Sequence, residues 1–434
     1  MAVSWSTNKR VTKPTVKYGT SNGTLDSCAS SGVSITYDTA PNWANHVVLS
    51  GLEPNTQYFY MVDGGEVNSF KTARCAGDMT AYNVSVVVDM GTMGEIGLND
   101  HLPKGIVGLH KNETNTMDRL IAQMTDYEFI AHPGDIAYAD YAFKEQVTGF
   151  TNMSAGSMTT YYNAINEAFH DEMTALSKIK PYMIGVGNHE ANCDNGGYKQ
   201  YSEQWCPRGL TNFTQYKVHW NMPGDGSISN NFWYSFDYGM THYLVFDTET
   251  DLAPPQKGAT IQGGTENFDE ANVGAYPNAQ NDFIKNDLAN VDRSKTPWVV
   301  AMGHRPWYVG SNGSGFQDGL ANFEPLFVDG KVDLVMHGHV HLLSRSYPVW
   351  NNGTIQQTNY TNAQAPVYIV NGAAGHYDGL DAAKYPIPNY IPFVNDTMYS
   401  YSQLEFHNKT HLTHRFRASS DNHVIDEITL IKNR

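Results

Sequence analysis

Residues 84–91 read VSVVVDMG, an apolar run that ends in an aspartate and a small turn. The same form recurs in residues 181–190, PYMIGVGNHE, and in residues 332–341, VDLVMHGHVH. Such continuous apolar runs are typical of strands buried in a parallel sheet, whose carboxyl ends lie at one edge. The three runs therefore predict an α/β fold that gathers polar loop residues at a single edge.

Residues with oxygen or nitrogen donors follow these runs and occur in two further motifs, GDIAYAD (residues 134–140) and AMGHRPWY (residues 301–308). The candidate metal ligands, in chain order, are Asp89, Asp135, Tyr138, Asn188, His304, His339 and His341. Carboxylate, amide, phenolate and imidazole donors suit iron, manganese or zinc, and seven ligands exceed what one ion would use. Taken singly, each motif is more often a helix cap, a turn or a solvated histidine than part of a catalytic site. Their joint occurrence in this order favours a site for two metal ions.

This order of motifs resembles that of the metallophosphoesterases, and in detail it is similar to the purple acid phosphatases, especially their fungal branch. Most members of the wider superfamily have D-x-H in the first motif, whereas this chain has Asp89-Met90-Gly91. The resemblance implies that Tyr138 takes the place of the missing histidine and favours ferric iron. It extends from about Ser85 to the C-terminus, includes the N-terminal domain, and is carried by segments such as NNFWYSFDYGMTHYLVFDTET (residues 230–250).

The resemblance also implies a metal assignment for each ligand. The ferric ion would be held by Asp89, Tyr138 and His341. A divalent ion (Fe, Zn or Mn) would be held by Asn188, His304 and His339, with Asp135 bridging the two. A shared carboxylate can hold two cations about 3.5–4 Å apart, the spacing of two-metal hydrolytic sites.

The activity that the resemblance implies is acid phosphatase: hydrolysis of small phosphate monoesters to inorganic phosphate by a metal-bound hydroxide at an Fe(III)–M(II) centre. Zinc already lowers the pKa of bound water to about 7, and ferric iron acidifies water more strongly, so hydroxide would persist in acid. The chain departs from the family in two places. Ala301 stands where valine is usual. Residues 304–316, HRPWYVGSNGSGF, lack the histidine pair of plant-type members, so the proton donor assigned there does not transfer.

His189 and Glu190 are the candidate catalytic residues. An imidazole can be cationic at acid pH, so His189 could contact the phosphate beside Asn188 and donate a proton to the leaving oxygen. Glu190 would then orient His189. The alternative is that His189 only orients a metal ligand. Arg305 could clamp phosphate or be a buried structural ion.

The composition is that of an ordinary globular protein with an acidic balance. The 434 residues include 28 basic and 44 acidic side chains, a formal net charge of −16. This charge disfavours nucleic acid and anionic membranes as partners, and no apolar run approaches the ~20 residues of a membrane span. A phosphate ester is also an anion, so bound metal ions would have to dominate the local field.

Cysteines and sequons predict a secreted glycoprotein. The natural pairing of the four cysteines is Cys28–Cys75 and Cys193–Cys206, although three connectivities are possible. The N-x-S/T sequons begin at Asn22, Asn83, Asn112, Asn152, Asn212, Asn312, Asn352, Asn359, Asn395 and Asn408. The chain begins MAVSWST, in which no signal peptide is visible, so we expect that a leader has been removed.

Two domains are expected. Residues 1–80 contain short alternating runs separated by turn signals, which predicts a β-sandwich. GLEPNTQYFYMV (residues 51–62) is similar to the fibronectin-type-III-like domain that precedes many purple acid phosphatases. For residues 81–434 the resemblance implies a double-sheet β-α-β-α-β sandwich with helices outside, and the tail from residue 400 predicts closing antiparallel strands.

Two rival functions remain open. A phosphodiesterase or nucleotide pyrophosphatase of the same superfamily would use a similar site, but with D-x-H and without a tyrosine ligand. A non-catalytic metal-binding protein of the cell surface would explain the sequons and the sandwich, but not seven ordered ligands. Visible colour separates all three, and turnover of a generic monoester separates an enzyme from a binding protein.

Overall fold

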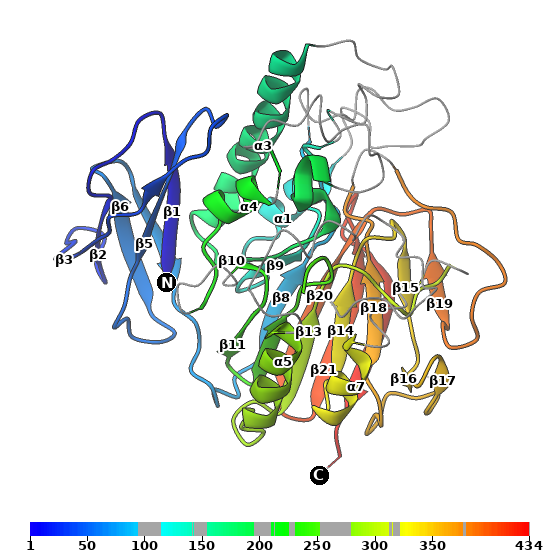
Figure 1. Ribbon diagram of the computed structural model, residues 1–434. Coiled ribbons are helices and arrows are strands. Elements are labelled where there is room, and N and C mark those ends of the chain that lie inside the picture. The colour runs from blue at the N-terminus through cyan, green and yellow to red at the C-terminus, as the bar shows by residue number, and fades with distance from the viewer. Residues whose placement is uncertain are drawn as a thin grey trace.

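The computed structural model describes residues 1–93, 114–140, 142, 154–194, 210–211, 213–224, 231–251, 279–311, 315, 322–375 and 379–433. Figure 1 shows a small all-β part, built from the N-terminal strands in blue, beside a larger part in which helices cover sheets.

Short strands separated by turns form the N-terminal part, as the alternating runs predict. Their bounds are β1 (Ala2–Thr7), β2 (Thr15–Gly19), β3 (Ser27–Ser30), β4 (Ser34–Ile35), β5 (Trp43–Val48), β6 (Gln57–Val62) and β7 (Val67–Lys71). A three-stranded sheet, β1-β5-β4, faces a four-stranded sheet, β3-β2-β6-β7, across a core that includes Val16, Val47 and Phe70. The predicted β-sandwich is confirmed. The gap between β7 and β8 supports our proposed domain boundary near residue 80.

The predicted Cys28–Cys75 disulfide is wrong, because both cysteines have exposed, free thiols. Cys28 lies in β3 and Cys75 follows β7, the two opposite edges of the four-stranded sheet. Three strand spacings amount to about 14 Å, whereas a disulfide needs Cα atoms less than about 7 Å apart. The other predicted pair cannot be compared, since Cys206 lies outside the described residues.

The first sheet of the larger part has six strands in the order β10-β9-β8-β20-β21-β22. Their bounds are β8 (Tyr82–Val86), β9 (Ile130–Pro133), β10 (Tyr182–Gly185), β20 (Ser400–Asn408), β21 (His411–Ala418) and β22 (Val424–Ile431). The first three run parallel to one another. The C-terminal three are the antiparallel closing strands that the tail predicts.

The second sheet has seven strands in the order β11-β12-β13-β14-β18-β15-β19. Their bounds are β11 (Tyr234–Tyr238), β12 (Thr241–Val245), β13 (Trp298–Met302), β14 (Leu334–His337), β15 (Leu343–Arg345), β18 (Val367–Asn371) and β19 (Phe393–Asn395). Its central strands β12, β13, β14 and β18 are parallel, as expected. Between β15 and β18 the chain forms a separate antiparallel hairpin of β16 (Val349–Trp350) and β17 (Thr354–Ile355).

The two sheets pack face to face, and each is covered by helices on its outer side. Alternate residues show why the strands are apolar throughout: Val300 of β13 packs between the sheets, whereas Val299 packs under the helices α5 (Ala279–Asn290) and α7 (Glu324–Asp329). The other sheet is covered by α1 (Thr116–Ala122), α3 (Ala155–Ser177) and α4 (Thr214–His219). Within the described residues no helix has the length and apolar character of a membrane span.

Candidate metal centre

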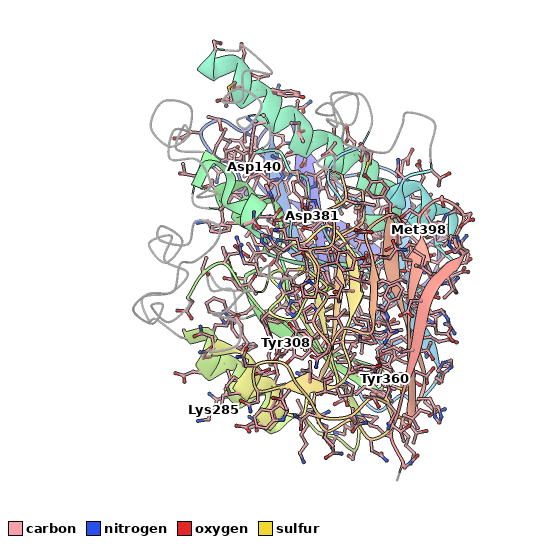
Figure 2. The ribbon with its side chains drawn as sticks, turned by 90° about the vertical axis from the view of Figure 1, so that its right-hand side faces the viewer. Asp140, Lys285, Tyr308, Tyr360, Asp381 and Met398 are labelled. Carbon is pink, nitrogen blue, oxygen red and sulfur yellow. The ribbon has the colours of Figure 1, made fainter. Side chains whose placement is uncertain are left out.

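The seven candidate ligands lie just beyond the carboxyl ends of five parallel strands. Asp89 follows β8, Asp135 and Tyr138 follow β9, and Asn188 begins a 3₁₀ helix, η2 (Asn188–Asp194), beyond β10. In the other sheet, His304 follows β13, and His339 and His341 follow β14. The facing sheets therefore bring both sets of loops together. Asp140 belongs to the loop after β9, the loop that carries Asp135 and Tyr138, and Figure 2 shows it at the end of the molecule where α3 lies.

The hydroxyl of Tyr138 is the centre of a first group of donors. It lies 2.8 Å from Oδ1 of Asp89, 3.2 Å from Oδ2 of Asp135 and 3.0 Å from Nε2 of His341. These four side chains are the ferric set that the resemblance implies, including the bridging carboxylate. The Nδ1 atom of His341 lies 3.2 Å from the carbonyl oxygen of Gly379, which can only accept, so Nδ1 donates to it and Nε2 faces the site.

A second group of donors meets the same Oδ2 atom of Asp135. Nε2 of His304 lies 3.0 Å from Oδ2 of Asp135 and 3.2 Å from Oδ1 of Asn188. Donor atoms of Asp135, His304 and His339 all lie within 4.8 Å of one another, a spacing that one metal ion could share. Burial and the nearby guanidinium of Arg305 hold the pKa of His339 well below its usual range, so this imidazole stays neutral and able to coordinate.

The backbone at the site is unusual in a way that the motifs explain. Asp89, Asp135, Tyr138 and His339 have φ values of 59°, 52°, 54° and 66°, the left-handed region. Each such residue costs of order 1–3 kcal/mol and persists only where its surroundings fix it. The glycines of the motifs are required because ligand carboxylates lie too close to them for a side chain to fit. A Cβ on Gly187 would lie 2.3 Å from Oδ1 of Asp135, and one on Gly338 would lie 2.2 Å from Oδ2 of Asp89.

Two carboxyl groups are fully buried here, and nearby positive charge favours the ionised form of both. Burial and the adjacent Asp135 raise the pKa of Asp89 well above its usual range. Burial also raises the pKa of Asp135, but His304 and His189 outweigh it and hold the pKa below its usual range. Cations bound among these oxygens would keep both groups ionised. The hard donors and their convergence therefore fit two bound metal ions.

The contacts of His189 differ from the sequence prediction. Its Nδ1 lies 2.7 and 2.9 Å from the carboxylate oxygens of Asp140, while its Nε2 lies 3.7 Å from Oδ2 of Asp135. Its ring lies over that of Tyr138, with centroids 4.2 Å apart. His189 thus presents one nitrogen to the metal site, and Asp140 rather than Glu190 orients it.

Glu190 instead holds the backbone of the ligand loops. Its carboxylate accepts N–H bonds of 2.8 Å from Asp135, Ile136 and Gly187. Neighbours in a 3₁₀ helix point about 120° apart, because the helix has 3.0 residues per turn, so Glu190 cannot face His189. Burial and Asp135 raise the pKa of Glu190 to about 8, against the three N–H donors. Bound cations would add to the effect of those donors.

Arg305 is a buried ion with a protein partner. It is 1% exposed, and its Nε lies 2.9 and 3.0 Å from the two carboxylate oxygens of Glu249, itself 1% exposed. Its Nη1 lies 3.1 Å from Nε2 of His339. Of the two sequence interpretations, the structure favours the structural ion over the phosphate clamp.

Comparison with known proteins agrees with this geometry along the whole chain. Three family descriptions match: "Purple acid Phosphatase, N-terminal domain" over residues 1–73, "Calcineurin-like phosphoesterase" over 101–343, and "Iron/zinc purple acid phosphatase-like protein C" over 365–427. "Acid phosphatase A" of Cryphonectria parasitica is 36% identical, over 100% of this chain and 89% of that protein. The chain belongs to the purple acid phosphatase family.

Other relatives support the assignment. "Acid phosphatase" of Aspergillus ficuum is 28% identical, over 96% of this chain and 82% of that protein. The purple acid phosphatase PPD1 of yellow lupin shares the fold, with a TM-score of 0.72, 21% identity, and coverage of 100% of this chain and 72% of that one. The predicted fold class is confirmed. The prediction of an enzyme is confirmed as well, since the chain is a hydrolase of the metallophosphoesterase family and its full-length relatives include acid phosphatases.

Sequence reasoning missed two participants. Asp140 has a sequence signal, since it ends the GDIAYAD motif two residues after Tyr138. Glu249 has none, because it reaches Arg305 from a loop that lies 56 residues away in the chain.

Proposed function

We propose that this member of the purple acid phosphatase family hydrolyses phosphate monoesters at acid pH with a dinuclear Fe(III)–M(II) centre. The observation that carries the proposal is the position of Asp135. Its Oδ2 lies 3.2 Å from the Tyr138 hydroxyl and 3.0 Å from Nε2 of His304, between the two donor groups. A carboxylate in that place is what a pair of neighbouring cations requires.

The residues divide into two sets in this proposal. The ferric set is Asp89, Tyr138, His341 and the bridging Asp135, and the divalent set is Asn188, His304, His339 and the same Asp135. When bound, the two ions neutralise the phosphoryl oxygens and supply the nucleophile at low pH. The phenol of Tyr138 favours Fe(III) in the first set, while an amide and two imidazoles accept Fe, Zn or Mn in the second.

His189 is the proton donor to the leaving oxygen in this proposal. Its Nε2 faces the bridging carboxylate, where the phosphate would lie, and Asp140 fixes the ring through Nδ1. An imidazole held in this way donates its proton from a defined position, which general acid catalysis requires. Asn188, which precedes it, would touch both the divalent ion and the substrate. Glu190 acts on these residues only through the loop backbone.

The first test is a substrate panel with metal analysis. A generic monoester such as an aryl phosphate, a diester and a nucleotide pyrophosphate are assayed at pH 4–8 on protein whose iron, zinc and manganese are counted. The proposal expects about one Fe and one divalent ion per chain, and monoester cleavage well above diester cleavage at acid pH. Faster diester or pyrophosphate cleavage would favour the phosphodiesterase rival. Bound metal without turnover would favour the binding protein.

We also propose that the protein passes through the secretory route. Four sequon asparagines in the described residues are exposed, Asn22, Asn352, Asn359 and Asn408. Asn83 is half-buried and donates its side-chain amide to the carbonyl of Asp126 at 2.9 Å, so we expect it to stay unmodified. A fall in mass on glycosidase treatment of the protein from its natural host would support this route, and an unchanged mass would contradict it.

A further inference from the structure

The conformation of the loops that carry the ligands has to be fixed by contacts with neighbouring elements. Asp89 and Tyr138 both have left-handed backbone conformations, which a non-glycine residue keeps only when neighbouring groups fix it. The long helix α3 lies against these loops. Figure 1 shows it at the upper end of the larger part, on the side of the N-terminal strands.

One face of α3 is bonded to both ligand loops. The carbonyl oxygen of Ile165 accepts the hydroxyl of Thr92 at 3.0 Å, and the backbone N–H of Thr92 donates to the carbonyl of Ala137 at 3.3 Å. About two helical turns further on, the carboxylate of Glu172 accepts the N–H of Met93 at 3.0 and 3.1 Å. The loop after β8 and the loop after β9 are thus tied to each other and to the same helix.

The other face of α3 is bonded to the N-terminal domain. The hydroxyl of Tyr37 donates to Oδ1 of Asn163 at 2.8 Å, and Nδ2 of Asn163 donates back to the carbonyl of Thr39 at 2.6 Å. One turn along, Glu167 accepts the side-chain amide of Asn42. All three N-terminal residues come from the connection between β4 and β5.

Tyr37 also joins the apolar packing beneath the site. A single buried cluster contains Tyr37, Tyr138, Ala139, Ala142, Met158, Tyr162, Ile165 and Leu210. Tyr37 is the buried member that the N-terminal domain contributes, and Ala40 is partly buried and packs against the same cluster. The same body of packed side chains therefore includes the candidate iron ligand and a tyrosine of the other domain.

We propose that Tyr37 is a positioning residue for the metal centre, through which the N-terminal domain holds Tyr138 in place by way of α3. This inference rests on the proposed function only in taking Tyr138 as a metal ligand. It gives the N-terminal domain, which contributes none of the candidate ligands, a role in the chemistry of its neighbour.

The test compares Tyr37→Ala with a matched control, Tyr58→Ala. Tyr58 is 7% exposed and stacks on Phe70 inside the core of the N-terminal sandwich. Its loss perturbs the same domain without touching α3. Tyr37→Leu keeps an apolar side chain, and serves if Tyr37→Ala does not fold. Hydrogen exchange is measured on the amides of residues 135–139 in metal-free full-length protein, and the rate of iron loss to a chelator is measured on loaded protein.

The proposal expects these amides to exchange about tenfold faster in Tyr37→Ala, and faster in the same direction in Tyr37→Leu, with wild-type exchange in Tyr58→Ala. Iron loss should accelerate in the two Tyr37 variants alone. Unchanged exchange in the folded Tyr37 variants would overturn the proposal, and so would an equal increase in Tyr58→Ala. If the wild type binds no iron, the proposed function fails, whereas the exchange comparison still decides whether Tyr37 positions the loop.

Discussion

Replacing Glu249 by glutamine should weaken the fold because it removes the negative charge from its buried ion pair with Arg305. Glu249 and Arg305 are each 1% exposed and meet at 2.9 and 3.0 Å. Removing one partner of a buried pair costs about 3–5 kcal/mol, since the remaining charge keeps its desolvation penalty without compensation. The magnitude is large for a single side chain, and it follows from burial rather than from the contact itself.

The expected change in melting temperature follows from the size of the chain. An unfolding entropy of roughly 2.1 cal/mol/K per residue gives about 0.9 kcal/mol/K for this chain, so the loss corresponds to a fall of about 3–6 °C. Calorimetry should be done on metal-free protein, because metal binding itself stabilises the folded state.

A double-mutant cycle provides the control. Glu249→Leu and Arg305→Leu should each destabilise the protein, whereas the double variant lacks both charges of this pair and should lie within about 1 kcal/mol of the wild type. If the two single effects add in the double variant, the ion pair is not coupled and the reasoning is refuted.

Three further predictions concern other groups. Burial lowers the pKa of His242, but aspartates 2.8 Å from both ring nitrogens raise it to about 9. Because the pKa of His242 is raised in the folded state, protonation of His242 stabilises the fold fully below about pH 6.5, and this stabilisation is lost as pH rises through about 9. The loss is at most about 3 kcal/mol before solvent screening. Denaturant unfolding at pH 6–9 should show this loss in the wild type and not in His242→Asn. His189→Ala should keep both metals but lower kcat by about 10²-fold, with the largest loss for esters with poor leaving groups. Asn188→Ala should instead lose the divalent ion selectively. Metal loss from His189→Ala, or equal slowing of all esters, would place His189 among the groups that only orient ligands. Asp140→Asn should keep both metals and KM while lowering kcat about tenfold or more, and an unchanged kcat would remove its orienting role.

The ligand clusters could be predicted from the sequence because each follows a parallel strand. Residues 86–88 and 334–336 are apolar and fully buried, as expected of strands covered on both faces, and the candidate ligands Asp89 and His339 lie one and three residues beyond them. Two facing sheets then bring Asp89 and His339 within 2.7 Å, across 250 residues of chain. The spacing within each motif therefore gave the residues, and the family resemblance gave their assignment.

What could not be predicted depends on local backbone direction and on contacts distant in sequence. Glu190 is next to His189 in the chain, yet the 3₁₀ turn of η2 directs it to backbone amides instead. Cys28 and Cys75 belong to one small domain, but sequence does not show that their strands lie at opposite edges of a sheet. The bond between Tyr37 and Asn163 joins residues 126 positions apart and has no motif.

The central claim is that Tyr138 binds ferric iron beside a divalent ion that shares Asp135. The most direct test is the visible spectrum of the purified enzyme, with its metal content, for the wild type and Tyr138→Phe. The hydroxyl of Tyr138 lies 2.8–3.2 Å from three other donor atoms. Tyr138→Phe removes only this oxygen and keeps the ring that packs in the buried cluster, so the fold should stay intact. The account predicts a visible band in the wild type that Tyr138→Phe abolishes in a folded protein. An unchanged band, or a colourless wild-type protein that contains its full complement of metal and is active, would contradict it.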